Sequence, residues 1–150
     1  MKMLIPIPIL LLALTVGAGA VQAAEAPAPR TPLHTSDCID PSQINEWHIV
    51  DARTAIVRTG PKRYLVTLQS ACPRLGMSPP GLIFRPNRSN ALVNRGRICG
   101  EVGETVHSRN QPPCAIESVS KIDKARFDQL SAHAKRHGSG AEQPTTMPAH

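Results

Sequence analysis

Four cysteines are the residues whose possible chemistry is most restricted by their spacing. Cys38, Cys72, Cys99 and Cys114 follow one another at intervals of 34, 27 and 15 residues. Structural zinc sites and redox-active thiols both use close pairs such as C-x-x-C, and the sequence has none. An even number of widely spaced cysteines favours a disulfide framework instead. We therefore expect two disulfides, no metal site and no cofactor.

Which cysteines pair is not determined by the sequence, because four cysteines allow three connectivities. The order of the predicted strands favours Cys72–Cys99, which would join a hairpin exit to the next core strand. It equally favours Cys38–Cys114, which would connect the first and last strands. Each bridge would close a loop of tens of residues, for which chain entropy predicts a stabilisation of about 3–4 kcal/mol.

Basic residues form the second group with possible chemistry. The chain has 17 Lys and Arg against 11 Asp and Glu, a net charge of +6. Residues 53–97 contain nine basic residues and no acidic one. Arginine binds phosphate or carboxylate through two parallel hydrogen bonds, so clustered arginines would attract anions. The predicted anion-binding set is Arg58, Lys62, Arg63, Arg85, Arg88, Arg95 and Arg97. The alternative is that these charges only solvate the outer faces of strands and loops.

The ligands compatible with such a surface are an anionic envelope component or an acidic protein. Lipopolysaccharide phosphates and phospholipid head groups belong to the first class. Nucleic acid is disfavoured, because single-strand binders stack bases on aromatic side chains and only 3% of these residues are aromatic. A different class of function is an envelope structural or accessory protein. It would bind another protein through an exposed apolar patch, independently of salt.

No catalytic motif is present, and we expect that the protein is not an enzyme. The nucleophile elbow G-x-S-x-G is absent. His48 and His107 are expected to face the surface of strands, and the other four histidines fall in tails or on an exposed helix face. Glu101, Glu104 and Glu117 form no recognisable carboxylate pair. An unrecognised active site would require a deep pocket that holds a His or a carboxylate with a perturbed pKa.

The first 24 residues resemble a secretory signal peptide. Lys2 precedes an apolar run over residues 4–16, and small residues follow up to Ala24. Residues 25–37 form a spacer rich in Pro and Ala, and residues 38–137 are expected to be one domain. Residues 138–150 contain nothing that would anchor them, and we expect a disordered tail. The protein is then exported to the periplasm or the medium, with no transmembrane span after cleavage.

The elements expected within the domain are mainly strands. Residues 62–68 alternate between apolar and polar and are preceded by Gly60-Pro61, which predicts a hairpin with residues 54–59. Shorter strands are expected at 47–50, 82–84, 105–108 and 114–119, and a long exposed loop or a loosely paired turn at 85–96. Residues 123–137 predict an amphipathic helix that begins at Asp123. The fold class is therefore mainly β: a small antiparallel sheet or partly closed barrel with one C-terminal helix, stapled by disulfides.

Four short motifs of the chain resemble a family of small bacterial secreted proteins that is described only as a domain of unknown function. They are Cys38-Ile39, Tyr64–Leu68 with Cys72-Pro73, Arg97–Gly100, and Cys114–Ile116. The resemblance covers residues 38–127 and implies a β-rich fold with cysteines on its strands. It implies no catalytic residue. Members often carry an Asp in the turn after the third cysteine, where this chain has Gly103-Glu104.

Overall fold

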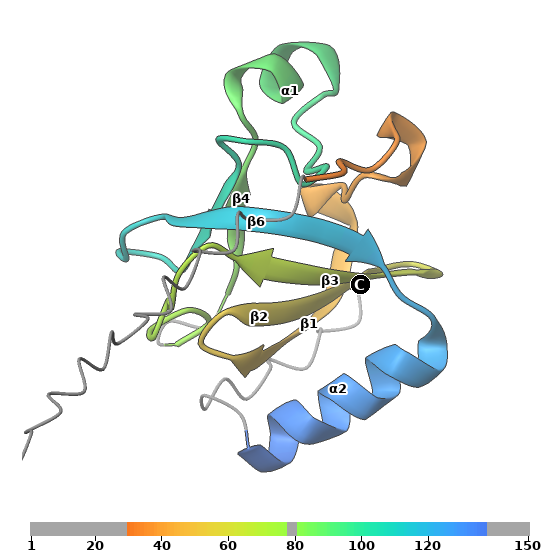
Figure 1. The fold of residues 1–150 in the computed structure, drawn as a ribbon, viewed down its shortest axis with the longest axis vertical. Coiled ribbons are helices and arrows are strands. Elements are labelled where there is room, and N and C mark those ends of the chain that lie inside the picture. Colours follow the sequence, from red (N-terminus) through yellow and green to blue (C-terminus); the bar gives the residue numbers. More distant parts are fainter. Residues whose placement is uncertain (1–29, 78–80, 138–150) are drawn as a thin grey trace, which may run out of the picture.

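One curled antiparallel sheet of six strands forms the body of the protein (Figure 1). The structure is a computed structural model that describes residues 30–77 and 81–137. The predicted fold class, a mainly β half-barrel with a C-terminal helix and disulfides, is confirmed. The predicted signal peptide and C-terminal tail lie outside the described residues. The strands and helices are β1 Ile44–Asp51, β2 Thr54–Thr59, β3 Lys62–Leu68, β4 Ile83–Arg85, α1 Arg88–Val93, β5 Thr105–His107, β6 Cys114–Lys121 and α2 Lys124–His137.

The strand order in the sheet is β1-β2-β3-β6-β5-β4, and every neighbouring pair is antiparallel. The hairpin between β2 and β3 has the predicted bounds. Its turn is Gly60-Pro61, and Gly60 adopts a φ of 58°, which glycine tolerates and other residues disfavour. Asp51 accepts a hydrogen bond from the backbone N–H of Arg53 at 2.8 Å, as expected for an Asp at the start of the β1–β2 turn.

The concave face of the sheet holds the larger core. Alternate residues of each strand point inward because side chains in a strand alternate between its two faces. Three residues outside the named strands pack against the side of this inward-facing core: Leu75, Ile39 and Ile98. The members contributed by the strands are Trp47, Ile49, Ala55, Val57, Tyr64, Val66, Leu68, Phe84, Val106, Ile116 and Val119.

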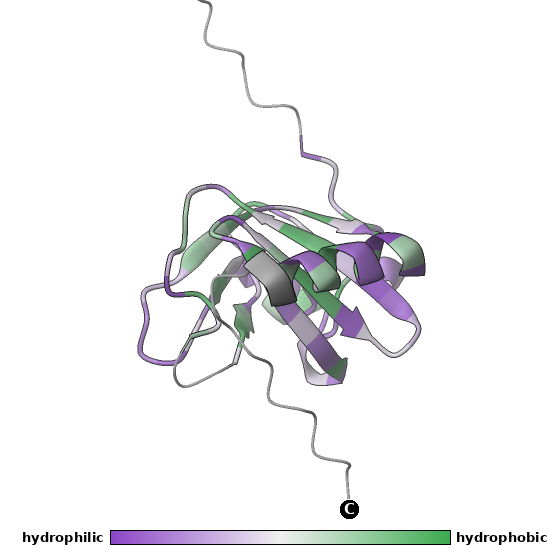
Figure 2. Ribbon diagram, turned by 90° about the horizontal axis from the view of Figure 1, so that it is seen from below, coloured by the Kyte–Doolittle hydropathy of each residue, from purple (hydrophilic) through white to green (hydrophobic). Residues whose placement is uncertain are grey.

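Helix α2 covers the opposite face of β1 and β2 (Figure 2). Phe127 and Leu130 pack on Val50 and Ile56, with Ala134 at the edge of the contact. These residues form the apolar face of the amphipathic helix that was predicted for residues 123–137. Asp123 caps the helix as expected, since its carboxylate accepts a hydrogen bond from the backbone N–H of Arg126 at 2.7 Å. The central residues of β1 and β2 are therefore buried on both faces, which explains the short uninterrupted apolar segments Ile49-Val50 and Ala55-Ile56-Val57.

All four cysteines form disulfides, but the predicted pairs are wrong. The first bond joins Cys38 to Cys99, with Cα atoms 4.5 Å apart. Backbone hydrogen bonds in both directions connect Ile39 and Ile98, at 2.8 and 2.9 Å, and this bridge places the two adjacent cysteines side by side. The backbone N–H of Leu33 also donates to the Cys99 carbonyl at 2.8 Å. The packed domain thus begins by Leu33, within the segment that was expected to be a spacer.

The second disulfide joins Cys72 to Cys114, with Cα atoms 6.2 Å apart. Strand β3 pairs with β6, and the pairing continues beyond β3 through a hydrogen bond from Gln69 N–H to the Ala115 carbonyl at 3.0 Å. The exit of the hairpin therefore lies beside the start of the last strand. The sequence prediction paired it with the preceding cysteine because it assumed that elements adjacent in the chain are also adjacent in space.

Residues 85–96 are not the long loop that was predicted. Asn87 caps helix α1 through a hydrogen bond from Asn90 N–H to its side-chain oxygen at 2.7 Å. The chain leaves α1 through Arg95 and Gly96, both with positive φ. Helix α1 projects at one end of the molecule and α2 lies at the other (Figure 1). Neither of these helices, nor any other among the described residues, has the length and apolar character needed to cross a bilayer.

Candidate functional site: the basic surfaces

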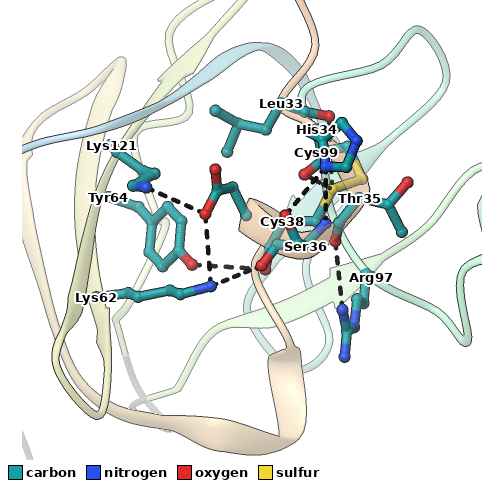
Figure 3. A network of polar contacts seen from close by, with 11 residues as sticks. Leu33, His34, Thr35, Ser36, Cys38, Lys62, Tyr64, Arg97, Cys99 and Lys121 are labelled. Carbon is teal, nitrogen blue, oxygen red and sulfur yellow. Dashed lines mark hydrogen bonds and ion pairs between the residues drawn. A yellow bond between two sulfur atoms is a disulfide. The ribbon is translucent and has the colours of Figure 1, made fainter.

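Lys62 and Arg97 hold the N-terminal segment against the open side of the half-barrel (Figure 3). The Lys62 Nζ donates to the Ser36 carbonyl at 2.6 Å, and the Arg97 guanidinium donates to the Thr35 carbonyl at 3.3 Å. Lys62 also lies 3.5 Å from the carboxylate of Asp37. These two members of the predicted anion-binding set are thus engaged within the protein.

Asp37 is the acidic centre of this contact. The Nζ of Lys121 on β6 donates to its carboxylate at 3.0 Å, and this hydrogen bond is the main reason why the pKa of Asp37 lies below its ordinary value. Lys62 lowers the pKa further. Beneath them the hydroxyl of Tyr64 donates to the Cys38 carbonyl at 3.5 Å. Burial raises the pKa of Tyr64, although a hydrogen bond to Thr59 opposes this.

Arg58 and Arg63 lie on the helix-covered face of the sheet, opposite to Lys62. They are directly paired across β2 and β3. The Arg58 Nε lies 3.0 Å from the Glu46 carboxylate, so its charge is compensated within the protein. The Arg63 guanidinium lies 6.0 Å from the centre of the Phe127 ring and donates to the Pro61 carbonyl at 2.9 Å. These two residues contribute to the edge of the α2 interface.

The remaining three members of the set are exposed and flank one short helix. Arg85 ends β4, Arg88 begins α1, and Arg95 follows α1. Among residues 30–77 and 81–137, none of these three arginines forms an ion pair. We call residues 85–97, together with the adjoining turn 101–103, the α1 lobe. The fold therefore divides the predicted set of seven basic residues, and within that set the exposed arginines without an ion pair among the described residues are the three that flank α1.

A buried carboxylate fixes the α1 lobe to the sheet. Glu104 is 0% exposed, and it accepts hydrogen bonds from the backbone N–H groups of Cys99, Gly100 and Glu101 at 2.9, 2.7 and 3.0 Å. The side-chain amide of Asn90, itself buried, donates to the same carboxylate at 2.8 Å. Gly100 is required there, because a Cβ would lie 2.8 Å from the backbone nitrogen of Val119.

The adjoining turn is tied to the cap of the helix. The side-chain amide of Asn87 donates to the Val102 carbonyl and to the Glu101 carboxylate, both at 3.0 Å. Sequence reasoning missed both α1 and the role of Glu104. The signal for α1 was present as a capping Asn at its start and a Gly three residues after its end. Glu104 was missed because its burial depends on the fold: three of its partners lie just before it in the chain, but Asn90 comes from helix α1.

His48 was expected to face solvent, and this prediction is wrong. It is buried under α2, where the edge of its ring contacts Phe127. Its Nε2 lies 3.0 Å from both the Ser131 hydroxyl and the Glu46 carboxylate. In a catalytic triad the acid and the nucleophile contact different ring nitrogens, whereas here both contact the same one. The cluster fastens α2 to β1. His107, the other strand histidine, is half-buried.

A cavity of about 330 Å³ lies beside the Cys72–Cys114 disulfide. Its lining contains no histidine and no carboxylate. The buried Ser108 hydroxyl is engaged, since it accepts a hydrogen bond from the Gly76 N–H at 2.6 Å. Among the described residues, no three His, Cys, Asp or Glu side chains are placed to share a metal ion. The cavity is lined by Ala71, Cys72, Pro73, Arg74, Leu75, Ser108, Gln111, Pro112 and Cys114.

Comparison with known proteins identifies a family. A family described as "Family of unknown function (DUF6491)" matches residues 1–138, which is most of the chain. No curated protein and no solved structure shows significant similarity.

Proposed function

Because the chain belongs to the DUF6491 family of unknown function, we propose a function from its structure: an exported domain that binds an anionic envelope component and catalyses no reaction. The binding surface is the α1 lobe, with Arg85, Arg88 and Arg95 as its anion contacts. This narrows the anion-binding surface proposed from sequence to three of its seven members.

The observation that carries this proposal is the uneven compensation of charge. Arg53, Arg58, Lys62, Lys121 and Lys124 each form an ion pair with a carboxylate of this chain. Within the described residues, Arg85, Arg88 and Arg95 form no ion pair, and all three are exposed. Arg74, Arg109 and Arg126 are also exposed without an ion pair there, but they do not flank a single helix as the three arginines of the α1 lobe do. Arginines without internal partners that flank one fixed element can meet phosphate or carboxylate groups of a ligand without first breaking a contact.

Export is supported by the disulfides together with the N-terminal pattern. Disulfides persist in oxidising compartments, and two of them crosslink this domain. Fractionation of cells that express the full chain tests this point. We expect the mature protein in the periplasm or medium, with an N-terminus at Ala24 or Glu25. A cytoplasmic protein with an intact N-terminus would contradict export.

The binding proposal is tested with the triple variant Arg85→Glu/Arg88→Glu/Arg95→Glu on phosphocellulose, a phosphate-bearing matrix. We expect the variant to elute at clearly lower salt than the unmodified protein, because binding through ionic contacts weakens with ionic strength. Arg74→Glu/Arg109→Glu/Arg126→Glu is the matched control, since these arginines are exposed, lie outside the lobe and change the net charge equally. Equal elution of both variants would show that only the net charge matters and would refute the proposal.

The alternative function, binding of another envelope protein, makes a different prediction. Such a complex would survive both high salt and the arginine reversals. Pull-down of envelope extracts at low and high salt separates the two functions, because only the anionic ligand is lost at high salt.

A further inference from the structure

The α1 lobe also carries the three most exposed large apolar side chains in the described part of the chain. Leu92 is 81% exposed, Val93 is 80% and Val102 is 73%, whereas the next two, Met77 and Ile83, are 41% and 38%. Leu92 and Val93 end α1, and the turn that holds Val102 contacts the start of α1 through Asn87. Soluble monomers rarely expose several large apolar side chains together, and such a cluster marks an interaction surface.

These apolar side chains stand on a fixed support. Asn90 faces inward from the same helix and bonds the buried Glu104, which also binds three backbone N–H groups behind it. The Cys38–Cys99 disulfide adjoins this network through Cys99. Leu92, Val93 and Val102 therefore lie on an anchored part of the fold and not at the frayed end of a loop.

One residue of the lobe is held in a disfavoured conformation. Arg95 has a φ of 53°, a region that glycine adopts freely and other residues occupy at a cost. The next residue, at position 96, is a glycine, whereas position 95 is an arginine despite its positive φ. Because glycine at position 95 would relieve this strain, the retained arginine indicates that its side chain has a function.

We propose that the ligand of the α1 lobe is an anionic lipid surface, into which Leu92, Val93 and Val102 insert while the surrounding arginines bind lipid phosphates. This inference rests on the proposed function and names its ligand. A segment that carries exposed apolar side chains together with exposed arginines matches the boundary between acyl chains and charged head groups of a bilayer leaflet. A protein partner that covered the same apolar residues would have to supply acidic groups around them.

The test uses the mature protein with vesicles of phosphatidylcholine that contain about one third phosphatidylglycerol, a composition at which each basic residue near the surface adds to binding. Leu92→Ser/Val93→Ser/Val102→Ser should lower the partition coefficient by about tenfold or more, since each side chain loses its apolar burial. Met77→Ser/Ile83→Ser is the control and should bind as the unmodified protein does. Retained disulfides and unchanged Trp47 fluorescence show that each variant is folded.

The same serine variant separates this inference from the proposed function. It should still elute from phosphocellulose at the salt concentration of the unmodified protein, because its arginines are intact. If its vesicle binding is unchanged, or if the unmodified protein does not bind vesicles, insertion is refuted while anion binding stands. If the arginine reversals leave the phosphocellulose elution unchanged relative to their control, the proposed function itself fails. Equal binding to pure phosphatidylcholine vesicles would also refute the inference.

Two single variants give readouts that a purely structural lobe would not show. In Leu92→Trp the new indole should be quenched by brominated acyl chains, while the buried Trp47 should not. Arg95→Gly should unfold at a higher temperature, because the positive φ is relieved, and should nevertheless bind anionic vesicles more weakly. Unquenched Leu92→Trp, or an Arg95→Gly protein that binds as tightly as the unmodified one, would overturn the inference.

Discussion

The side-chain amide of Asn90 donates a hydrogen bond of 2.8 Å to the buried carboxylate of Glu104. This contact connects a helix of six residues to the turn that precedes β5. Three backbone N–H groups complete the carboxylate's partners. Asn90 is the buried residue of α1, so the position of the helix depends on this contact together with the hydrogen bonds of its capping residue Asn87.

Replacing Glu104 by Gln should therefore be strongly destabilising. The carboxylate oxygens of Glu104 accept hydrogen bonds from N–H donors, but the amide nitrogen of Gln is itself a donor and would face these donors unpaired. We therefore expect a loss of about 2–4 kcal/mol in the free energy of unfolding. Urea titration followed by Trp47 fluorescence measures it. Glu117→Gln is the control, because its exposed ion pair with Arg53 should contribute less than about 1 kcal/mol. Similar losses in both variants would contradict the role of Glu104.

The disulfide connectivity is directly testable by peptide mapping. Arg63, Arg97 and Arg109 lie between successive cysteines, so trypsin releases each cysteine in a separate peptide. The unreduced digest should contain Cys38 linked to Cys99 and Cys72 linked to Cys114. With sequence separations of 61 and 42 residues, removal of either bond as a pair of Ala substitutions should cost about 4 kcal/mol. Peptides that link Cys72 to Cys99 would refute the pairing.

Tyr64 should limit stability in alkali. Burial raises its pKa in the folded state above the unfolded value of about 10, so its contribution is complete below about pH 10 and is lost as the pH rises through the folded pKa. Tyr64 is the only tyrosine, so tyrosinate absorbance reports on it alone. The absorbance should rise together with the change in Trp47 fluorescence, and Tyr64→Phe should remove this step. Tyrosinate formed in a still folded protein would contradict the prediction.

Asp37 should make the protein sensitive to acid. Its pKa is lowered in the folded state, so its contribution to stability is present above the ordinary value of about 3.9 and is lost as the pH falls through the folded pKa. Lys121→Gln should weaken this dependence more than Lys62→Gln, because the Lys121 hydrogen bond is the main cause of the lowered pKa. The free energy of unfolding, measured between about pH 6 and pH 2, gives the comparison. The reverse order of the two variants would contradict it.

Local features of the fold were predictable from sequence, since local physics determines them. The hairpin of β2 and β3 follows from the alternation along residues 62–68 and the turn residues Gly60-Pro61, and the start of α2 follows from the capping Asp123. The cysteine pairs were not predictable, because they depend on the Ile39–Ile98 bridge and on the pairing of β3 with β6.

The sequence predicted an excess of basic residues, but it did not predict where on the surface they lie. Alternation along β3 already puts Lys62 and Arg63 on opposite faces, and this alone divides the predicted set. Burial of His48 could not be foreseen either, since it depends on which face of β1 the distant helix α2 covers. Only the fold shows that Lys62 and Arg97 bind the chain's own carbonyl groups.

In chain order, the first cysteine is bonded to the third and the second to the fourth. On the proposed export route the chain crosses the membrane with its N-terminus first, so Cys38 and Cys72 meet the oxidising compartment before Cys99 is available. An oxidase that joins thiols as they emerge would link those two first. The native protein then depends on a thiol–disulfide isomerase, or on folding that precedes oxidation. Its yield should therefore fall in cells that retain the oxidase and lack the isomerase.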